Sequence, residues 1–508
     1  MPAKHAWSRQ FLASTTRLDG RVHVVTADLT LVIDVGKSHA RVLMVDDSGA
    51  VVARYQRDNH CIASPLGYPA LDVQGLEMWM RNTVKGSGLA SRCGRAIATT
   101  HGAAFVALCG DELAWQPLDY EFDDLQSAHD FRAACARSGD AFASTLSPDL
   151  PAGLNAARQL FWLQHAHPDA WHRTTCLMPY AQYWTWILSG VACTDVSSLG
   201  CHTHLWQPAR SEYSQLALSK GWAALFAPIL SAWEVAGPVR DVVAREWGLP
   251  ADCQVHVGAH DSNSCLARYI HPRATDVGTP ERLTIVSSGT WTVVMAPGAP
   301  PAALKGELDM LGNVDVTGRI TPTARFMGGR EFAVLLDEAA PDAGNGIGLN
   351  HVLNTRTFAL PAFASQGGPF ANRIGSIEKN GQPLTGRASG HLSAAERAAL
   401  AAIYCAQITY WLIDALWRGS ATGRAKVIVE GPLAHNNIFA RALQTLLPQA
   451  ACFISTDDLE GTARGAWNLA HWSNVQQGSY LSPVAASPID GLTGYHGQWL
   501  QRLTHHGG

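Results

Sequence analysis

The chain has 508 residues, which is enough for two large domains. Hydrophobic residues make up 47% of the sequence and charged residues 16%, a composition that allows sizeable cores and excludes global disorder. The formal net charge of −4 gives no electrostatic reason to expect nucleic acid or a membrane surface as a partner.

The first 27 residues are expected to form a flexible N-terminal tail. They carry Lys4, Arg9 and Arg17 but lack the apolar core of a secretory signal. No apolar run in the chain reaches the roughly 18 residues of a membrane span. The 11 cysteines form no CxxC pair, which indicates free thiols in a reducing compartment. We therefore expect a cytoplasmic protein.

The next part of the chain begins with β-rich segments separated by turns. Strands are expected at 29–33, 41–45, 51–55 and 96–99, and a helix at 71–85. Residues 150–235 are expected to be mainly helical, with their tryptophans packed in the core; a stacking platform for a sugar is the alternative. We assign residues 28–254 to an N-terminal domain.

A second strand-rich block starts near Gln254. Residues 254–270 predict a strand, a tight turn and a helix, and residues 282–298 predict a hairpin. A helix is expected at 393–416, followed by a strand at 427–429, a Gly-Pro loop and a helix. We assign residues 255–490 to a C-terminal domain.

Each half of the chain opens with a hairpin whose turn is small and polar. The first turn reads Asp34-Val35-Gly36-Lys37-Ser38 and the second reads Ser287-Ser288-Gly289-Thr290. A strand pair with a glycine turn lets backbone N–H groups approach an anion closely. Two such hairpins, one in each domain, could hold a phosphate chain from both sides of a cleft.

The sequence Gly36-Lys37-Ser38 matches the end of a P-loop, but the rest of that motif is missing. The first glycine of GxxxxGK[ST] would fall at Leu31, and the residues that follow are strand-like. The better interpretation is a hairpin turn in which Asp34 ends a buried strand and faces the cleft. An ordinary turn aspartate that bonds its own backbone is the alternative.

Asp261 lies between an expected strand and an expected helix, where α/β proteins place ligands. Phosphoryl transfer to an alcohol needs a base within reach of the hydroxyl, and kinases use an aspartate. Taken alone, an aspartate at this position could also cap the helix, and helix capping is the commoner role of such an aspartate. The two roles are compatible if the carboxylate points into the cleft.

Three further segments carry polar residues of interest. Gly431 lies in a loop that leads into a helix containing Asn436, and such a loop suits contact with a nucleotide. A plain connection between a strand and a helix is the alternative. His101-Gly102 ends a strand and could contact substrate hydroxyls; a half-buried structural histidine is the alternative. Cys201-His202-x-His204 offers soft metal ligands, but its spacing matches no zinc pattern.

Together these segments resemble the FGGY family of carbohydrate kinases, from about Leu29 to about Trp467. The family's first phosphate hairpin, D-x-G-T-x-x-x-[RK], is matched by Asp34, Gly36 and Arg41, with Lys37 in place of the threonine. The later matches are Thr194, Asp195 and Ser198 for the family's TD-x-S stretch, residues 258–261 for the G-x-x-D of its base, residues 288–291 for its second hairpin in the SSGTW form, Gly431 and Asn436 for its adenosine loop with Pro432 in place of a glycine, and residues 460–466 for a late helix start.

The resemblance implies an α/β protein of two actin-like (ribonuclease H-like) ATPase domains, each a mixed β-sheet flanked by helices, with ATP and a sugar in the interdomain cleft. It implies that Asp261 is the catalytic base and that Asp34 holds Mg²⁺, with Asp261 as a second metal contact. The implied ATP contacts are Asp34, Gly36, Lys37, Ser38, Arg41, Gly289, Thr290, Gly431 and Asn436. The implied substrate contacts are His101, Gly102, Asp119, Glu121 and Asp261.

The expected substrate is a ketose such as a rhamnulose-, fuculose- or xylulose-type sugar. The SSGTW hairpin and residues 326–331 favour the rhamnulokinase and fuculokinase side of the family. Two alternatives stay open: a catalytically weak regulator that binds sugar, and a non-catalytic actin-like ATPase. The position of Asp261 argues against the second. A homodimer is expected from the resemblance alone.

Overall fold

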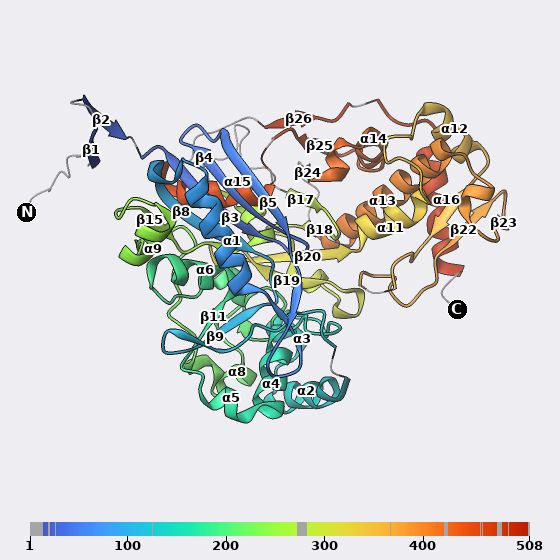
Figure 1. The fold of residues 1–508 in the computed structure, drawn as a ribbon. Coiled ribbons are helices and arrows are strands. Elements are labelled where there is room, and N and C mark those ends of the chain that lie inside the picture. Colours follow the sequence, from blue (N-terminus) through green and yellow to red (C-terminus); the bar gives the residue numbers. More distant parts are fainter. Residues whose placement is uncertain are drawn as a thin grey trace, which may run out of the picture.

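The computed structural model describes residues 14–18, 21–25, 27–123, 125–271, 282–365, 367–420, 425–457, 459, 461–474, 480–485 and 487–505. Two mixed sheets organise these residues, one in each half of the chain, and helices cover both (Figure 1). Within the expected N-terminal tail, β1 (Ser14–Leu18) and β2 (Arg21–Val25) form an antiparallel hairpin, while residues 1–13 lie outside the described residues.

The first sheet has seven strands among the described residues. Its order is β14 (Val235–Pro238), β15 (Gln254–His256), β8 (Cys93–Thr100), β3 (Leu29–Val35), β4 (His39–Asp46) and β5 (Val51–Asp58), and β16 (Ala259–His260) also pairs with β8. The strands expected at 29–33, 41–45, 51–55 and 96–99 are confirmed, each a few residues longer. The helix expected at 71–85 is α1 (Val73–Gly86).

Strand β3 is buried along its whole length because helices cover both faces of the sheet. Leu29, Leu31 and Ile33 pack with α1 and α6 (Tyr180–Ser189) on one face. Val32 packs on the other face with α15 (Gly461–Ala470). Successive residues of β3 therefore face two different cores, and the buried Thr30 on this strand meets its polar need through the His471 ring at 2.9 Å.

The helical region expected at 150–235 forms a lobe below the first sheet (Figure 1). It holds α4 (Ala156–Ala166), α5 (Pro168–His172), α7 (Val196–Leu199) and α8 (Gln215–Ser219), with α2 (Leu125–Ser138) beside them. It also holds β11 (Cys176–Pro179), which joins β9 (Phe105–Cys109) and β10 (Glu112–Trp115) in a small sheet. Trp171, Trp184 and Trp186 are buried, as the packing interpretation predicts, whereas Trp162 is half-buried against the same core as Trp171.

The second sheet also has seven strands among the described residues. Its order is β19 (Leu311–Val314), β20 (Ile320–Phe326), β18 (Thr292–Met295), β17 (Arg282–Ser288), β24 (Ala425–Glu430), β25 (Ala450–Ser455) and β26 (Leu481–Pro483). The chain therefore changes from the first sheet to the second between His260 and Arg282. The domain boundary expected at residue 254 stays a prediction.

Helix α13 (Ala394–Leu416) is the long central helix of the second domain. Ser393 and Glu396 form the capping box that begins it. Its 23 residues are long and apolar enough to cross a membrane, but 83% of its most apolar 18-residue window is buried inside the protein. Its side chains meet α11 (Gly328–Leu336), α12 (Gly346–Asn354) and α14 (Asn437–Leu446). Burial of this kind identifies α13 as a core helix.

Helices α10 (Asp261–Ile270) and α15 cross closely between the two sheets. A Cβ atom placed on Gly465 of α15 would lie 1.6 Å from the carbonyl oxygen of Ser264 in α10. The crossing therefore needs a residue without a side chain. The Trp467 indole N–H donates to the carbonyl of Asp46 at 3.2 Å, which ties α15 to the turn after β4.

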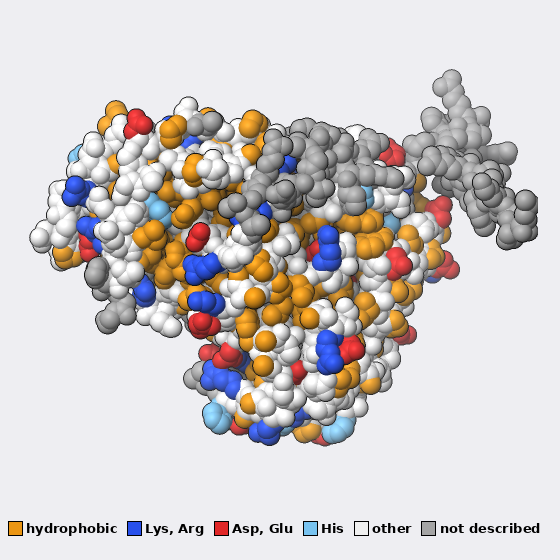
Figure 2. All heavy atoms as spheres, turned by 180° about the vertical axis from the view of Figure 1, so that it is seen from behind, with side chains coloured by type: hydrophobic (Ala, Val, Ile, Leu, Met, Phe, Trp, Pro, Cys, Tyr) orange, Lys and Arg blue, Asp and Glu red, His pale blue; other side chains and the backbone are white. Residues whose placement is uncertain are grey.

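Charged side chains of both signs are mixed on the described surface drawn in Figure 2. The blue and red atoms alternate there with apolar and uncharged ones, and the described residues form no continuous basic band on that face. A mixed surface agrees with the formal net charge of −4.

Candidate active site

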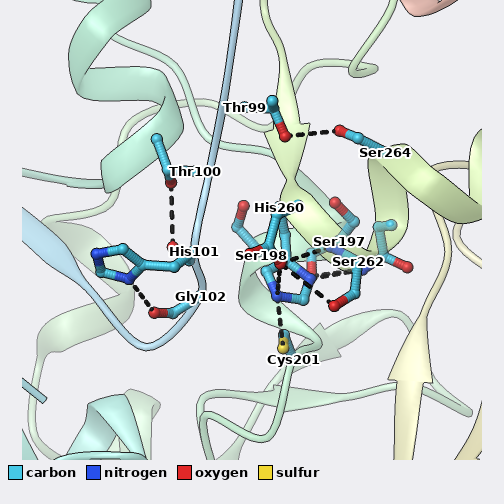
Figure 3. A network of polar contacts seen from close by, with 12 residues as sticks. Thr99, Thr100, His101, Gly102, Ser197, Ser198, Cys201, His260, Ser262 and Ser264 are labelled. Carbon is cyan, nitrogen blue, oxygen red and sulfur yellow. Dashed lines mark hydrogen bonds and ion pairs between the residues drawn. The ribbon is translucent and has the colours of Figure 1, made fainter. Parts of the chain in front are cut away.

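Three parallel strands end at one edge of the first sheet and bring the expected site segments together. Asp34 of β3 pairs with Thr99 of β8, and Thr100 of β8 pairs with His260 of β16. The backbone N–H of His101 donates to the carbonyl of Val35 at 2.9 Å. Because neighbouring strands lie about 4.8 Å apart, the residues that follow these strands are neighbours. Figure 3 shows His101, Gly102 and His260 around this edge.

Asp261 is the first residue of α10, and His260 occupies the cap position. The carboxylate accepts from the backbone N–H of Ser262 at 2.5 Å, and its Oδ1 lies 3.0 Å from Nε2 of His260. The helix-cap alternative is therefore not what the structure shows, since a cap would accept from an N–H two or three positions on. The Asp261 side chain is 30% exposed, so a substrate can reach it.

His260 has contacts that fix the proton on its ring. The Asn263 side-chain nitrogen lies 3.2 Å from Nδ1 of His260, and it also faces the oxygens of Ser197 at 3.3 Å and Asn313 at 3.1 Å. Burial by itself lowers the pKa of the His260 ring, but Cys201 and Asp261, next to Nε2, outweigh burial and raise that pKa well above its ordinary value, so Nε2 carries a proton. The Cys201 sulfur lies 3.4 Å from Nε2 (Figure 3).

The electrostatic balance at Asp261 favours the carboxylate. Burial by itself raises the pKa of this group, but the neighbouring His260 ring and the Ser262 N–H outweigh burial and leave the pKa below its ordinary value. An ionised carboxylate is the form that can accept a proton. The Asp261 side chain is thus an ionised carboxylate at neutral pH.

Gly102 lets the backbone lie directly against the ring of His260. A Cβ atom at position 102 would lie 2.9 Å from the His260 ring and 3.3 Å from the Cys201 sulfur. The neighbouring His101 is buried between the rings of Tyr120 and Tyr180, each centred 5.3 Å away. Burial lowers the pKa of His101, so its ring is neutral.

The loop after β10 brings the two expected acidic substrate contacts to the first hairpin. Asp119 is buried and accepts from the Cys61 thiol and from the Lys37 ammonium. Glu121 lies 3.5 Å from the same ammonium, which also sits 5.0 Å from the centre of the Tyr120 ring. Cys61 was not expected in the site, since nothing in its local sequence marks it.

The first hairpin has the predicted form. Strand β4 follows the turn where a P-loop would have a helix, which confirms the rejection of that motif. The turn is held by Asn59, whose side chain donates to the carbonyl of Gly36 at 2.6 Å and whose backbone donates to Ser38 at 2.8 Å. Asp34 is buried at the end of β3, with Arg41 at 3.4 Å.

The second hairpin and the Gly431 loop form one unit. The backbone N–H of Gly289 donates to the carbonyl of Trp291 at 2.8 Å, and Thr290 accepts from Gly329 at 3.2 Å. Gly431 has φ +77°, and a Cβ atom there would lie 2.0 Å from the carbonyl of Ser288. Glycine is thus required by both backbone conformation and space.

Two residues next to this unit have structural contacts of their own. Asn436 caps α14 by accepting from the N–H of Phe439 at 3.0 Å. Glu430 binds Arg268 and Tyr269 of α10, so the helix that begins with Asp261 is connected to the loop of Gly431.

The segment Cys201-His202-x-His204 has contacts other than a metal. Nδ1 of His202 lies 2.8 Å from the carbonyl of Leu154, and Nε2 of His204 lies 3.3 Å from that of Pro148. Among the described residues no group of three or more His, Cys, Asp or Glu side chains could hold a metal ion. Glu460 of the late helix motif lies outside the described residues.

Comparison with known proteins gives a consistent family. The model of the C-terminal domain of FGGY carbohydrate kinases matches residues 280–478, and the model of the N-terminal domain of that family matches residues 150–267. These matches cover more than half of the chain.

Curated relatives match over part of their length. L-fuculokinase from Salmonella typhi is 24% identical over 283 residues, which are 53% of this chain and 56% of the relative. Xylulose kinase from Staphylococcus epidermidis is 21% identical over 249 residues, 47% of this chain and 48% of the relative. The chain thus spans about half the length of the curated relatives it matches.

Solved structures match over nearly the whole chain. A carbohydrate kinase from Novosphingobium aromaticivorans has a TM-score of 0.80 and 32% identity, covering 94% of this chain and 99% of that one. A xylulose kinase from Lactobacillus acidophilus has a TM-score of 0.72 and 13% identity, covering 94% and 96%. The second likeness shows the fold alone, which is the two-domain actin-like fold expected from the sequence.

Proposed function

The chain belongs to the FGGY family of carbohydrate kinases, and we propose that it transfers the γ-phosphoryl group of ATP to a hydroxyl of a sugar with Asp261 as the general base. The observation that carries this proposal is the setting of Asp261. Its carboxylate is partly exposed, ionised and held beside His260, at the edge where the first hairpin also ends. In the reaction the sugar oxygen gives its proton to Asp261 and forms a bond to phosphorus, while the bond from phosphorus to ADP breaks.

The nucleotide contacts are proposed for the two hairpin turns and the Gly431 loop. Gly36, Lys37, Ser38 and Arg41 would meet the phosphates from one side, and Gly289 and Thr290 from the other. Gly431 and Asn436 would meet the adenosine. The direct packing of Gly431 on Ser288 supports this, since it makes the second hairpin and the loop one surface.

Magnesium fits the carboxylates at this edge. Mg²⁺ is commonly held by one or two carboxylates together with phosphate oxygens and water. Asp34 and Asp261 supply two carboxylates at the same edge of the sheet, at the ends of β3 and β16 on either side of β8, and a larger cage is absent from the described residues. When bound, Mg²⁺ would neutralise charge on the phosphates.

The sugar is proposed to lie near His101, Gly102, Asp119 and Glu121. A ketose of the fuculose, rhamnulose or xylulose type remains the proposed substrate, and the L-fuculokinase and xylulose kinase relatives support that class. A cytoplasmic location fits the free cysteines and the burial of α13. A homodimer stays a prediction from the family.

The test is an ADP-release screen over ketoses, aldoses and polyols. Wild-type protein is expected to release ADP with at least one sugar, and Asp261→Asn to lose at least ~100-fold of that rate, the usual worth of a general base. Asp252→Asn, at an exposed position, is the matched control. Full activity of Asp261→Asn would refute the base. Sugar binding without any turnover would identify a regulator instead.

A further inference from the structure

Lys37 joins two parts of the site that have different tasks. It belongs to the turn of the first hairpin, where the family has a threonine beside the phosphates. In this structure its ammonium instead contacts Asp119 and lies 3.5 Å from Glu121, both in the loop proposed to hold the sugar. The Tyr120 ring, centred 5.0 Å away, adds a cation–π contact. Lys37, from the hairpin proposed to bind phosphate, is therefore held by Asp119 and Glu121, from the loop proposed to bind the sugar.

Asp119 is the fixed partner of this pair. Its side chain is 5% exposed. Its backbone N–H donates to the carbonyl of Pro69 at 3.0 Å, and its carboxylate accepts from the Cys61 thiol and from the backbone N–H of Glu121 at 2.9 Å. Burial raises the pKa of Asp119, but these donors and Lys37 outweigh burial and keep the carboxylate ionised.

Lys37 is the movable partner. Its side chain is 22% exposed, and an ammonium on four methylene groups can turn to a new acceptor without a change in the backbone. A sugar hydroxyl can donate to the Asp119 oxygen that accepts from Lys37 and so take the place of the ammonium. A phosphate group is then the strongest acceptor available to the displaced cation.

We propose that Lys37 is a catalytic cation that is held on Asp119 in the sugar-free enzyme and moves to the γ-phosphoryl group when a sugar hydroxyl replaces it on Asp119. The inference rests on the proposed kinase function and goes beyond it, because it states how the sugar site controls the phosphate site. ATP bound without a sugar would lack this cation, so transfer of its phosphoryl group to water would be slow. Sugar binding would supply the acceptor hydroxyl and release the cation together.

The test measures ADP release in the absence of any sugar. Asp119→Asn keeps the shape of the side chain and removes the nearer of the two charges that hold Lys37, so sugar-free ADP release is expected to rise about tenfold, the equivalent of about 1.4 kcal/mol from one charged hydrogen bond. The double variant Lys37→Met/Asp119→Asn is expected to return to the wild-type rate, because it lacks the Lys37 ammonium that would otherwise reach the γ-phosphoryl group. Asp111→Asn, an exposed carboxylate in the turn between β9 and β10, should leave the rate unchanged.

Lys37→Met alone provides a second measurement that does not depend on the folding of Asp119→Asn. With the best sugar of the screen, its kcat is expected to fall at least ~100-fold, since the cation acts on the transferred group, while the KM for the sugar should not rise, since Lys37 no longer competes with the sugar for Asp119. An unchanged kcat overturns the proposal.

Two other outcomes of the sugar-free assay also overturn it. One is a wild-type rate in a folded Asp119→Asn variant, and the other is a raised rate that persists in the double variant. If the wild-type protein phosphorylates no sugar, the proposed kinase function is wrong. If it phosphorylates a sugar but the sugar-free assay gives one of these two outcomes, only the proposed role of Lys37 is wrong.

Discussion

Replacing Gly465 by alanine should separate the two helices that join the domains. The added Cβ would lie 1.6 Å from the Ser264 carbonyl oxygen, whereas real Cβ atoms stay at least 3.0 Å from such an atom. Helices α10 and α15 must therefore move apart by about 1.4 Å at their crossing. The obstacle is backbone, so no side-chain rotation can relieve it. The expected cost is about 3 kcal/mol, the upper part of the range for overpacking.

Thermal unfolding and steady-state kinetics check this expectation together. For domains of this size 3 kcal/mol lowers Tm by roughly 6–12 °C. Since Asp261 begins α10, a shift of about 1 Å should also lower kcat about 100-fold. Gly497→Ala is the matched control, because Gly497 lies in α16 (Leu492–His505) with no atom within 4 Å of the added Cβ. It should be neutral or raise stability by up to about 1 kcal/mol. A Gly465→Ala variant with wild-type Tm and kcat would refute the close crossing.

Three further predictions concern the nucleotide loop, pH and metal. Gly431→Ala combines φ +77° with a Cβ 2.0 Å from Ser288, so the affinity for ATP, measured by calorimetry, should fall about tenfold; Gly67→Ala, with φ +87° and open space, is the control for backbone strain alone. Burial lowers the pKa of His471 to about 3, so below pH 6.5 the unfolded chain takes up a proton that the folded chain does not, and stability falls. In urea unfolding, the free energy of unfolding should fall between pH 6.5 and pH 5.0 by roughly 2 kcal/mol less in His471→Gln than in the wild type. An equal fall in both proteins would contradict the lowered pKa of His471. Removal of divalent cations with EDTA should abolish sugar-dependent ADP release and added Mg²⁺ should restore it, whereas full activity in EDTA would exclude the proposed metal.

The elements of the fold follow from local pattern, and so they could be predicted. Strand β3 is rich in β-formers and is followed by a turn with a glycine, and α13 begins at a capping box. The hairpin around Gly289 has its glycine at the turn. In each case the residues that decide the structure lie within a few positions of one another.

The contacts that complete the site join residues far apart in the sequence. Cys61 and Asp119 are 58 positions apart, and Asn263 and Asn313 are 50 apart. The crossing of Gly465 on Ser264 spans still more of the chain. No local pattern encodes such pairs, because they depend on how the strands are ordered. The residue at which α10 begins could not be predicted either, and a shift of one residue decides whether Asp261 caps the helix or is its first residue.

The thiol of Cys61 makes the site accessible to chemical labelling. Of the 11 cysteines, Cys61 and Cys109 are the exposed ones, so a thiol reagent should react with the folded protein at these two. Burial and the hydrogen bond to Asp119 raise the pKa of Cys61 to about 11, which makes its thiolate scarce and its labelling slow. Any ligand that takes over Asp119 frees this thiol or covers it, while Cys109 reports the unchanged background. A change in the rate of modification at Cys61 therefore reports that a ligand has bound at Asp119, whatever that ligand is.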